Sequence, residues 1–275
     1  MFADDTCLVY VDSDLKRLED HANKRLQTIY EWCKYNRMSL NPSKSEYLII
    51  TNKKIDYDPD IKINGETVHR KSSIKYLGMF IDERLKFTDH IDNLKTKLSR
   101  LAGVTYRLKH MLNLKTAKIF YYSCVYSVLT YCICAWGGTL KNGHRGDSII
   151  KLQTRIVKNI FARHFTDNSC IYSKVGILKL VDIYKFYCSI RMFKRIRETT
   201  PVVSSTIIPI RYPTHEHRTR GRHNLITPFP RVDAIKYNFQ YQFIIIWNEV
   251  PESIKESNSV KIFKRRLMSH ITNTY

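Results

Sequence analysis

Glycine and proline are scarce in this chain, which holds 9 and 8 of them among 275 residues. The sequence also contains no low-complexity tract and no repeat of fixed period. These absences argue against a disordered chain and against a repeat architecture. With 43% hydrophobic residues the chain is long enough to bury a sizeable core, and we expect a soluble globular protein of one or two domains.

Acidic side chains are also few, because 25 Asp and Glu stand against 46 Lys and Arg, a formal net charge of +21. The imbalance begins after residue 50: residues 1–50 hold 7 basic and 8 acidic side chains, whereas 51–275 hold 39 and 17. This charge favours a nucleic acid as the partner of the middle and C-terminal parts. An anionic membrane, or a charge that serves only solubility, are the alternatives.

The seven cysteines are an odd number and follow no signal peptide, which predicts reduced thiols in an intracellular protein, nuclear or cytoplasmic and not secreted. The uncharged run IFYYSCVYSVLTYCICAWGGTL, between Lys118 and Lys141, is long enough to cross a bilayer. Its tyrosines, serines and flanking lysines instead indicate a buried helix and no membrane partner. Cys124, Cys132, Cys134 and His144 lack the paired spacing of a zinc site, so buried thiols are favoured.

Residue patterns predict an α+β first part and a helical remainder. For the first part we expect a strand or hairpin over 2–11 with Ala3-Asp4-Asp5 at its turn, a helix from Leu15 to Cys33, a strand at 47–51, a hairpin turning at Asn64-Gly65, and a strand at 76–82. For the remainder we expect helices at 88–112, 114–135, 147–163, 178–197 and 258–271, with a short strand or helix around FQYQFIIIW. The loop 209–230, rich in Pro, His and Arg, is predicted either to contact nucleic acid or to be a basic linker.

The opening stretch MFADDTCLVYV raises a chemical question, because Asp4 and Asp5 adjoin an apolar, strand-like run. An ionised carboxylate among buried strand residues costs several kcal/mol unless it is paired or holds a metal. Mg²⁺ prefers hard oxygen ligands, and phosphoryl transfer commonly uses two such ions about 3.5–4 Å apart. The pair therefore predicts a magnesium-binding turn.

Several segments together resemble a known family, the reverse transcriptases of non-LTR (LINE-type, jockey-like) retrotransposons. FADDT is similar to the Phe/Tyr-Ala-Asp-Asp box of that family, and the blocks that follow it come in the family's order: WCKYNRMSLNPSKSEYLII, IKYLGMFIDERLKFTDHI, YCICAWGG and WNEVPESIKESNSVKIFKRRL. The resemblance implies a partial palm over 1–86, a small antiparallel sheet with one helix that carries a catalytic and a primer-grip-like hairpin. A helical thumb over 87–140 and a mostly helical, basic extension over 141–275 would follow.

The resemblance also implies roles for individual residues. Asp4 and Asp5 would be catalytic metal ligands, and Lys44 would lie near the triphosphate of a dNTP. Tyr76, Leu77 and Gly78 would form the hairpin that grips the primer end. The cations expected to face a template–primer duplex, an RNA–DNA hybrid, are Lys95, Lys97, Arg100, Arg107 and Lys109.

The family pattern places a further catalytic Asp and the fingers before Met1, so the two-metal magnesium site is expected to be incomplete and the chain inactive alone. We therefore expect a truncated RNA-directed DNA polymerase. The alternatives are a non-catalytic nucleic-acid-binding remnant that uses the basic helices, or a decayed open reading frame. Lys44 and the basic stripe from Lys95 to Lys109 also admit a simpler interpretation as solvated surface charges.

Overall fold

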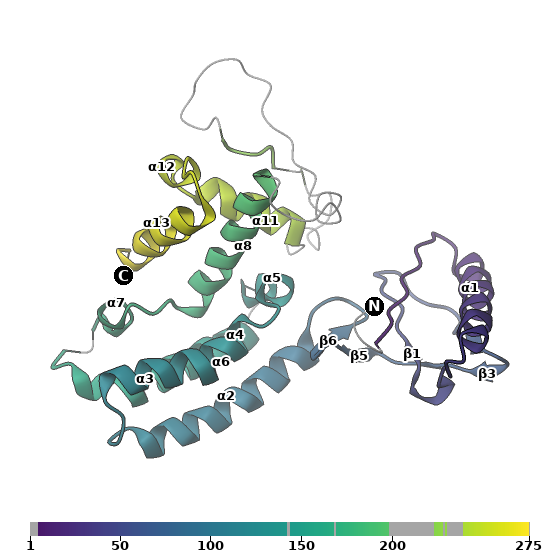
Figure 1. Cartoon of the computed structure of the whole chain (residues 1–275), viewed down its shortest axis with the longest axis horizontal. Helices are drawn as coiled ribbons and strands as arrows, with labels where there is room; N and C mark the ends of the chain where they lie inside the picture. Colours follow the sequence, from purple (N-terminus) through teal and green to yellow (C-terminus); the bar gives the residue numbers. More distant parts are fainter. Residues whose placement is uncertain are drawn as a thin grey trace. The chain divides into compact units, whose positions relative to one another are not determined.

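The computed structural model describes residues 5–141, 144–167, 169–197, 223–227, 229 and 239–274 (Figure 1). The chain divides into two compact units, Met1–His90 and Ile91–Tyr275, and each is described by itself. Helices dominate and strands are short, so the protein is α+β, as the sequence predicts.

The first unit is built on one long helix, α1 (Leu15–Tyr35), which confirms the predicted helix. It begins where the Asp14 carboxylate accepts hydrogen bonds from the backbone N–H groups of Lys16 (2.8 Å) and Arg17 (3.4 Å). Ala22 is the one buried residue of this helix, and it packs against Ile61, Ile63 and Val68. This cluster forms the small core of the unit.

The strands of this unit are two to four residues long and form three separate two-stranded ladders. The parallel ladder joins β1 (Glu46–Tyr47) to β4 (His69–Arg70). The antiparallel ladders join β2 (Lys62–Ile63) to β3 (Glu66–Thr67), and β5 (Ser73–Tyr76) to β6 (Met79–Asp82). The expectation of one small antiparallel sheet is therefore wrong for the described residues, because strands this short offer too few hydrogen bonds to recruit a third strand.

Two tight turns set the hairpins. Asn64 and Gly65 have φ of 51° and 82°, the left-handed pair that a type I′ turn requires, which confirms the predicted hairpin. Leu77 and Gly78 have φ of 46° and 80°, so a second hairpin turns at the residues where the family resemblance places one, whereas apolar patterning predicted a continuous strand from Tyr76 to Asp82. A leucine at positive φ is rare, which is why apolar patterning alone missed this turn.

The predicted strand around Cys7–Val11 does not form. Residues 6–12 pair with no described strand, and the side chains of Val9 and Val11 are 79% and 91% exposed. The predicted strand at 47–51 is reduced to Glu46–Tyr47. An apolar run becomes a strand only where another strand supplies its backbone hydrogen bonds, and the described chain supplies none here.

The second unit is helical and begins with α2 (Thr88–Leu108), which starts just before the boundary between the units. The backbone N–H of Thr88 donates to the Asp82 carboxylate at 3.0 Å. The elements that follow are α3 (Leu114–Phe120), the π-helix η2 (Tyr121–Tyr126), α4 (Ser127–Thr130), α5 (Ile133–Trp136), η3 (Gly137–Lys141), α6 (His144–Phe161), η4 (Ala162–His164), α7 (Ile171–Val175), α8 (Leu180–Ile196), α11 (Phe239–Glu249), α12 (Glu252–Lys255) and α13 (Val260–Thr272). In the first unit the short 3₁₀ turn η1 (Pro42–Lys44) precedes β1. The helices predicted at 88–112, 147–163, 178–197 and 258–271 are thus confirmed with shifted ends, and FQYQFIIIW is helical.

The predicted helix at 114–135 is interrupted. It passes through the π-helical turn and breaks at Cys132, whose φ is 49°. Tyr121, Leu129 and Trp136 are fully buried, whereas Ile119 and Tyr131 are 61% and 48% exposed, so one side of this uncharged run packs inside the helical unit. Among the described residues no single helix is long and apolar enough to span a membrane, although Leu114–Thr130 and Ile133–Leu140, bent by 48°, satisfy length and composition together.

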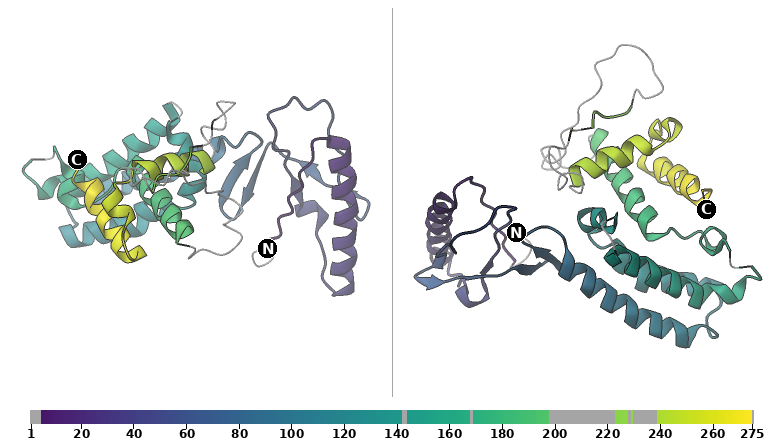
Figure 2. Two further views of the ribbon diagram at one scale, coloured as in Figure 1. Left: turned by 90° about the horizontal axis from the view of Figure 1, so that it is seen from above. Right: turned by 180° about the vertical axis from the view of Figure 1, so that it is seen from behind.

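Buried polar and aromatic contacts hold the helical unit together. The Gln153 side chain donates to the Tyr121 hydroxyl (2.9 Å) and accepts from the Leu180 backbone N–H (2.8 Å), which ties α6 to η2 and α8. Phe263 of α13 stacks on Phe193 of α8, with ring centroids 4.3 Å apart. Two further views show α11 and α13 beside α8 (Figure 2), where these helices make their main contacts.

Candidate nucleic-acid interface

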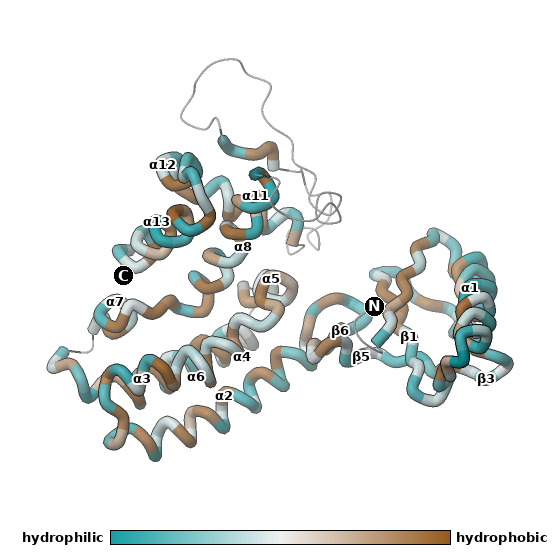
Figure 3. Tube along the Cα trace, in the orientation of Figure 1, coloured by the Kyte–Doolittle hydropathy of each residue, from teal (hydrophilic) through white to brown (hydrophobic). Residues whose placement is uncertain are grey.

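Helix α2 has one apolar and one basic face, and brown and teal alternate along it in Figure 3. Ile91, Leu94 and Leu98 are at most 4% exposed and face the protein interior. Lys97, Arg100 and Arg107 are exposed. At 100° per residue, these three cations lie within an arc of about 80° on the side opposite the buried leucines. We call Lys97, Arg100 and Arg107 the α2 basic face.

The other two predicted cations lie differently. Lys95 is exposed, but it borders the buried stripe and does not share the arc of the α2 basic face. Lys109 follows the end of the helix, is half-buried, and places Nζ 4.2 Å from the ring centroid of Tyr106. The Tyr106 side chain is 55% exposed, and Arg163 Nη1 donates to the Lys109 carbonyl at 3.2 Å. An aromatic ring among cations is suited to binding a nucleic acid. Arg163 is distant from Tyr106 and Lys109 in the sequence, and the fold brings it beside them.

The spacing of the α2 basic face matches a phosphate backbone. Lys97 and Arg107 are ten residues apart, about 15 Å along the helix axis. One strand of a duplex carries a phosphate about every 3.4 Å of axis, so three cations over that length reach separate phosphates. Cations with this spacing suit sequence-independent contacts to a polyanion.

The predicted primer-grip residues lie at the β5–β6 hairpin. Tyr76 pairs with Met79 at the end of the ladder, and Leu77 and Gly78 form its exposed turn. The positive φ of Gly78, 80°, is a conformation that glycine adopts without strain.

The predicted catalytic residues are only partly described. Asp4 lies outside the described residues. Asp5 is exposed at an isolated β-bridge, and Lys44 is exposed at the end of η1. Within the described part of the chain, no three His, Cys, Asp or Glu side chains come together as metal ligands. These residues alone therefore do not fit a two-metal magnesium site, which needs several carboxylates.

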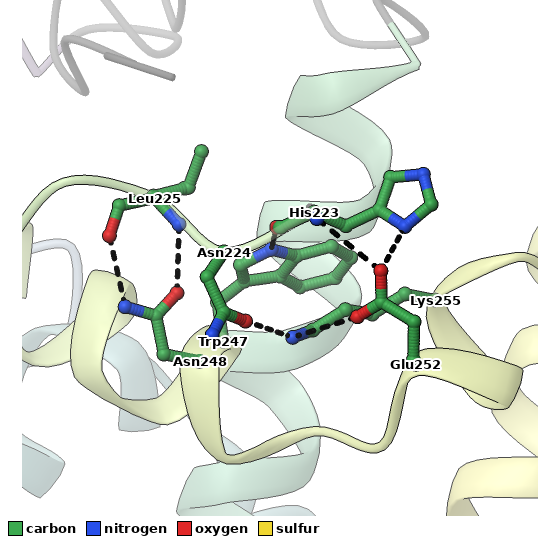
Figure 4. A network of polar contacts seen from close by, with 7 residues as sticks. All are labelled: His223, Asn224, Leu225, Trp247, Asn248, Glu252 and Lys255. Carbon is green, nitrogen blue, oxygen red and sulfur yellow. Dashed lines mark hydrogen bonds and ion pairs between the residues drawn. The ribbon is translucent and has the colours of Figure 1, made fainter. Parts of the chain in front are cut away.

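A polar network that the sequence did not predict joins the segment 223–225 to α11 and α12 (Figure 4). The Lys255 side chain is 2% exposed; its Nζ donates to Asn224 Oδ1 at 2.7 Å and lies 3.7 Å from Glu252 Oε2. Glu252 also accepts from the ring of His223. Burial lowers the pKa of Lys255, and the Glu252 carboxylate opposes that effect.

The same network anchors the segment 223–227 to α11. Trp247 Nε1 donates to the His223 carbonyl at 2.9 Å, and the Asn248 side chain pairs with both the N–H and the C=O of Leu225, each at 2.9 Å. Because one side chain bonds both backbone groups of Leu225, these two hydrogen bonds fix the register of this segment. The signal in the sequence was the polar set Trp247, Asn248, Glu252 and Lys255 in WNEVPESIK, but its partners lie more than twenty residues upstream.

Comparison with known proteins identifies relatives of this chain. It is 24% identical over 218 residues to the probable RNA-directed DNA polymerase from transposon BS of Drosophila melanogaster, which covers 76% of this chain and 23% of that protein. It is 25% identical over 238 residues to the corresponding protein of the X-element of the same organism, covering 83% of this chain and 25% of the relative. The Pol polyprotein of the type-1 retrotransposable element R1 of Bradysia coprophila is 27% identical over 144 residues, or 51% of this chain and 14% of that protein.

The chain is a distant homologue of non-LTR retrotransposon reverse transcriptases. This homology confirms the resemblance that FADDT and the following blocks carry. The chain spans a quarter or less of the length of the three relatives above. No protein-family model and no solved structure matches this reverse transcriptase homologue.

Proposed function

We propose that the chain is part of an RNA-directed DNA polymerase and binds an RNA template paired with a DNA primer. The homology supports this activity, since each of the two longest matches is to a probable RNA-directed DNA polymerase. The observation that carries the binding role is the α2 basic face, with its three exposed cations opposite a buried apolar stripe. By itself the chain is expected to bind and not to polymerise.

Each candidate residue has a role in this proposal. Asp4 and Asp5 contribute carboxylates to a magnesium site that further acids complete, and Lys44 approaches the triphosphate of the incoming dNTP. Tyr76, Leu77 and Gly78 contact the primer end through the exposed turn of the β5–β6 hairpin. Lys95 and Lys109 flank the α2 basic face and add to its positive field. Residues 1–86 and 87–140 would correspond to part of a palm and to a thumb, and 141–275 to a basic extension.

A salt titration tests the binding role. The full chain is mixed with a labelled RNA–DNA hybrid, and the dissociation constant is measured over a series of salt concentrations. Each phosphate contact adds about −0.9 to the slope of log affinity against log salt. The triple variant Lys97→Gln, Arg100→Gln, Arg107→Gln should therefore make the slope less negative by about 2.7 units.

Helix α13 offers a control that matches this variant in charge. Lys264, Arg265 and Arg266 are also one lysine and two arginines, and all are exposed. Replacing these three by Gln removes the same net charge and should leave most of the slope intact. Equal losses from both variants would show that only the overall charge matters, and would contradict an interface on α2.

A chimaera tests the catalytic role. The chain replaces the matching 218-residue segment in the transposon BS polymerase, and incorporation of dNTPs is measured on an RNA template with Mg²⁺. Asp4→Ala and Asp5→Ala should each abolish incorporation, whereas Asp56→Ala, at another exposed acid, should not. Full activity of the Asp4 and Asp5 variants would refute their assignment.

The alternative is a nucleic-acid-binding protein without catalysis, which the exposed cations of α2 also favour. It predicts the same salt slope but an inactive chimaera, even with both aspartates present. The two experiments together therefore separate the two functions.

A further inference from the structure

Tyr106, Lys109 and Arg163 gather where the end of α2 meets the end of α6, and we call these three residues the Tyr106 cluster. Tyr106 is 55% exposed, and Lys109 Nζ lies 4.2 Å from the centroid of its ring. Arg163 of η4 is exposed, and its Nη1 donates to the Lys109 carbonyl at 3.2 Å. A guanidinium carries five N–H donors and this contact uses one of them. The cluster therefore presents an accessible aromatic ring with two cations beside it.

The packing of α6 against α2 fixes the backbone beside this cluster. Asn159 Nδ2 donates to the Ala102 carbonyl and to the Thr105 hydroxyl, both at 3.2 Å. Thr105 is fully buried, and its hydroxyl donates to the same Ala102 carbonyl at 3.0 Å. Because Thr105 directly precedes Tyr106, these bonds hold the last turn of α2 in place. A ring that is positioned before binding loses little conformational freedom when a ligand stacks on it.

Tyr106 points in a different direction from the α2 basic face. At 100° per residue it lies about 100° around the helix from Arg107, the nearest member of that face. A duplex held on the α2 basic face therefore leaves the Tyr106 ring to another part of the nucleic acid. A base inside a duplex has both of its flat faces covered by its neighbours, whereas an unpaired base can stack on an aromatic side chain.

We infer that the Tyr106 cluster binds an unpaired nucleotide that extends from the template–primer duplex. The base stacks on the face of the Tyr106 ring that lies away from Lys109 Nζ, and Lys109 and Arg163 contact the adjoining phosphates. Every base has a flat aromatic face, so this contact accepts nucleotides of any sequence. This role rests on the proposed function, because the α2 basic face holds the duplex from which the nucleotide extends.

The experiment measures how much an unpaired extension adds to binding. Fluorescence anisotropy gives the affinity of the full chain for a blunt RNA–DNA hybrid and for the same hybrid with a short unpaired extension on the RNA or on the DNA strand. The extension should strengthen binding about tenfold. An abasic extension keeps the phosphates but has no base to stack, so it should lose most of this gain. No gain from an extension on either strand, or an equal gain from the abasic form, would overturn the proposal.

Substitutions at Tyr106 test whether the gain comes from its ring. In Tyr106→Ala the ratio of the affinities for the extended and the blunt hybrid should fall to about one, whereas Tyr106→Phe should keep the wild-type ratio because it retains the ring. Tyr131→Ala is the matched control, because Tyr131 is a tyrosine of the same helical unit that is 48% exposed, and it should also keep the ratio. Circular dichroism checks that each variant is folded. A wild-type ratio in folded Tyr106→Ala would contradict the role of the ring.

Failure of the proposed function would give a different result. If the α2 basic face does not hold the duplex, the triple variant at Lys97, Arg100 and Arg107 will bind the blunt hybrid as tightly as the wild type does. If only the role of the Tyr106 cluster is wrong, that triple variant will bind the blunt hybrid more weakly, and Tyr106→Ala will keep the wild-type ratio.

Discussion

The two units of this chain use apolar residues in different ways. Among the described residues of the first unit, the buried apolar side chains are few: Ala22, Ile61, Ile63, Val68 and Phe87. Trp32 and Tyr35 of α1 are 59% and 90% exposed. In the described part of the second unit each long helix contributes two or more buried side chains, and Trp247 is 2% exposed.

The difference shows that an apolar pattern is enough to predict a helix, whereas its apolar side chains become buried only where another element packs against them. Helix α1 has a side-chain cap and an amphipathic pattern as clear as that of α2, but its main contacts are with the short strand β2. Helix α8 is packed by both α11 and α13. Buried apolar area, not helix propensity, is therefore expected to separate the stability of the two units.

The largest difference in stability should come from replacing one tryptophan in each unit by alanine. Trp247→Ala should destabilise the second unit by about 3–5 kcal/mol, because it leaves a cavity and an unpaired His223 carbonyl. Trp32→Ala should change stability by only about 0.5 kcal/mol, because the side chain is mostly in solvent. Denaturant unfolding followed by circular dichroism measures both, and similar losses would break the comparison between the units.

The polar network of the second unit should give the next largest effect. Asn248→Ala should cost about 2 kcal/mol, because the N–H and C=O of Leu225 lose their partners. Asn36→Ala removes an exposed side chain that bonds the Trp32 carbonyl within the first unit, and it should cost less than about 1 kcal/mol. Thermal unfolding of the two variants tests the ranking, and a larger loss for Asn36→Ala would contradict it.

Alkaline pH should act on the second unit through its buried tyrosines. Burial raises the pKa of Tyr121 above its ordinary value of 10.0. The contribution of Tyr121 to the free energy of unfolding is complete below pH 10. It falls by about 1.4 kcal/mol per pH unit as the pH rises further, because this tyrosine ionises in the unfolded chain at a lower pH than in the folded protein. Tyr121→Phe should reduce the alkaline loss of stability by this contribution and Tyr35→Phe should not, as measured by unfolding at several pH values. Equal slopes in both variants would refute this origin.

The smallest effects should come from two glycines and have opposite signs. Gly65→Ala should destabilise the first unit by about 1 kcal/mol, because Gly65 has φ of 82° in its type I′ turn. Gly103→Ala should stabilise α2 by about 0.5–1 kcal/mol, because a Cβ there meets open space within a helix. Paired unfolding curves measure the two changes, and the same sign for both would count against the backbone argument.

Local chemistry made much of this protein predictable. Asp14 begins α1 with a side-chain cap, Asn64-Gly65 forms the expected turn, and the seven-residue apolar rhythm from Ile91 forms α2. Each of these features depends on residues within a few positions of one another. The exposure of the α2 basic face follows from the same rhythm.

Long-range contacts set the rest of the structure. The apolar run Cys7–Val11 reads as a strand, but a strand exists only with a partner that its own residues cannot provide. The pairing of His223 and Glu252 joins residues that no local pattern connects. The sequence by itself therefore determined the caps, turns, amphipathic helices and the distant polymerase homology, whereas the tertiary structure decided which apolar residues are buried and which polar groups meet, because burial and pairing depend on segments far apart along the chain.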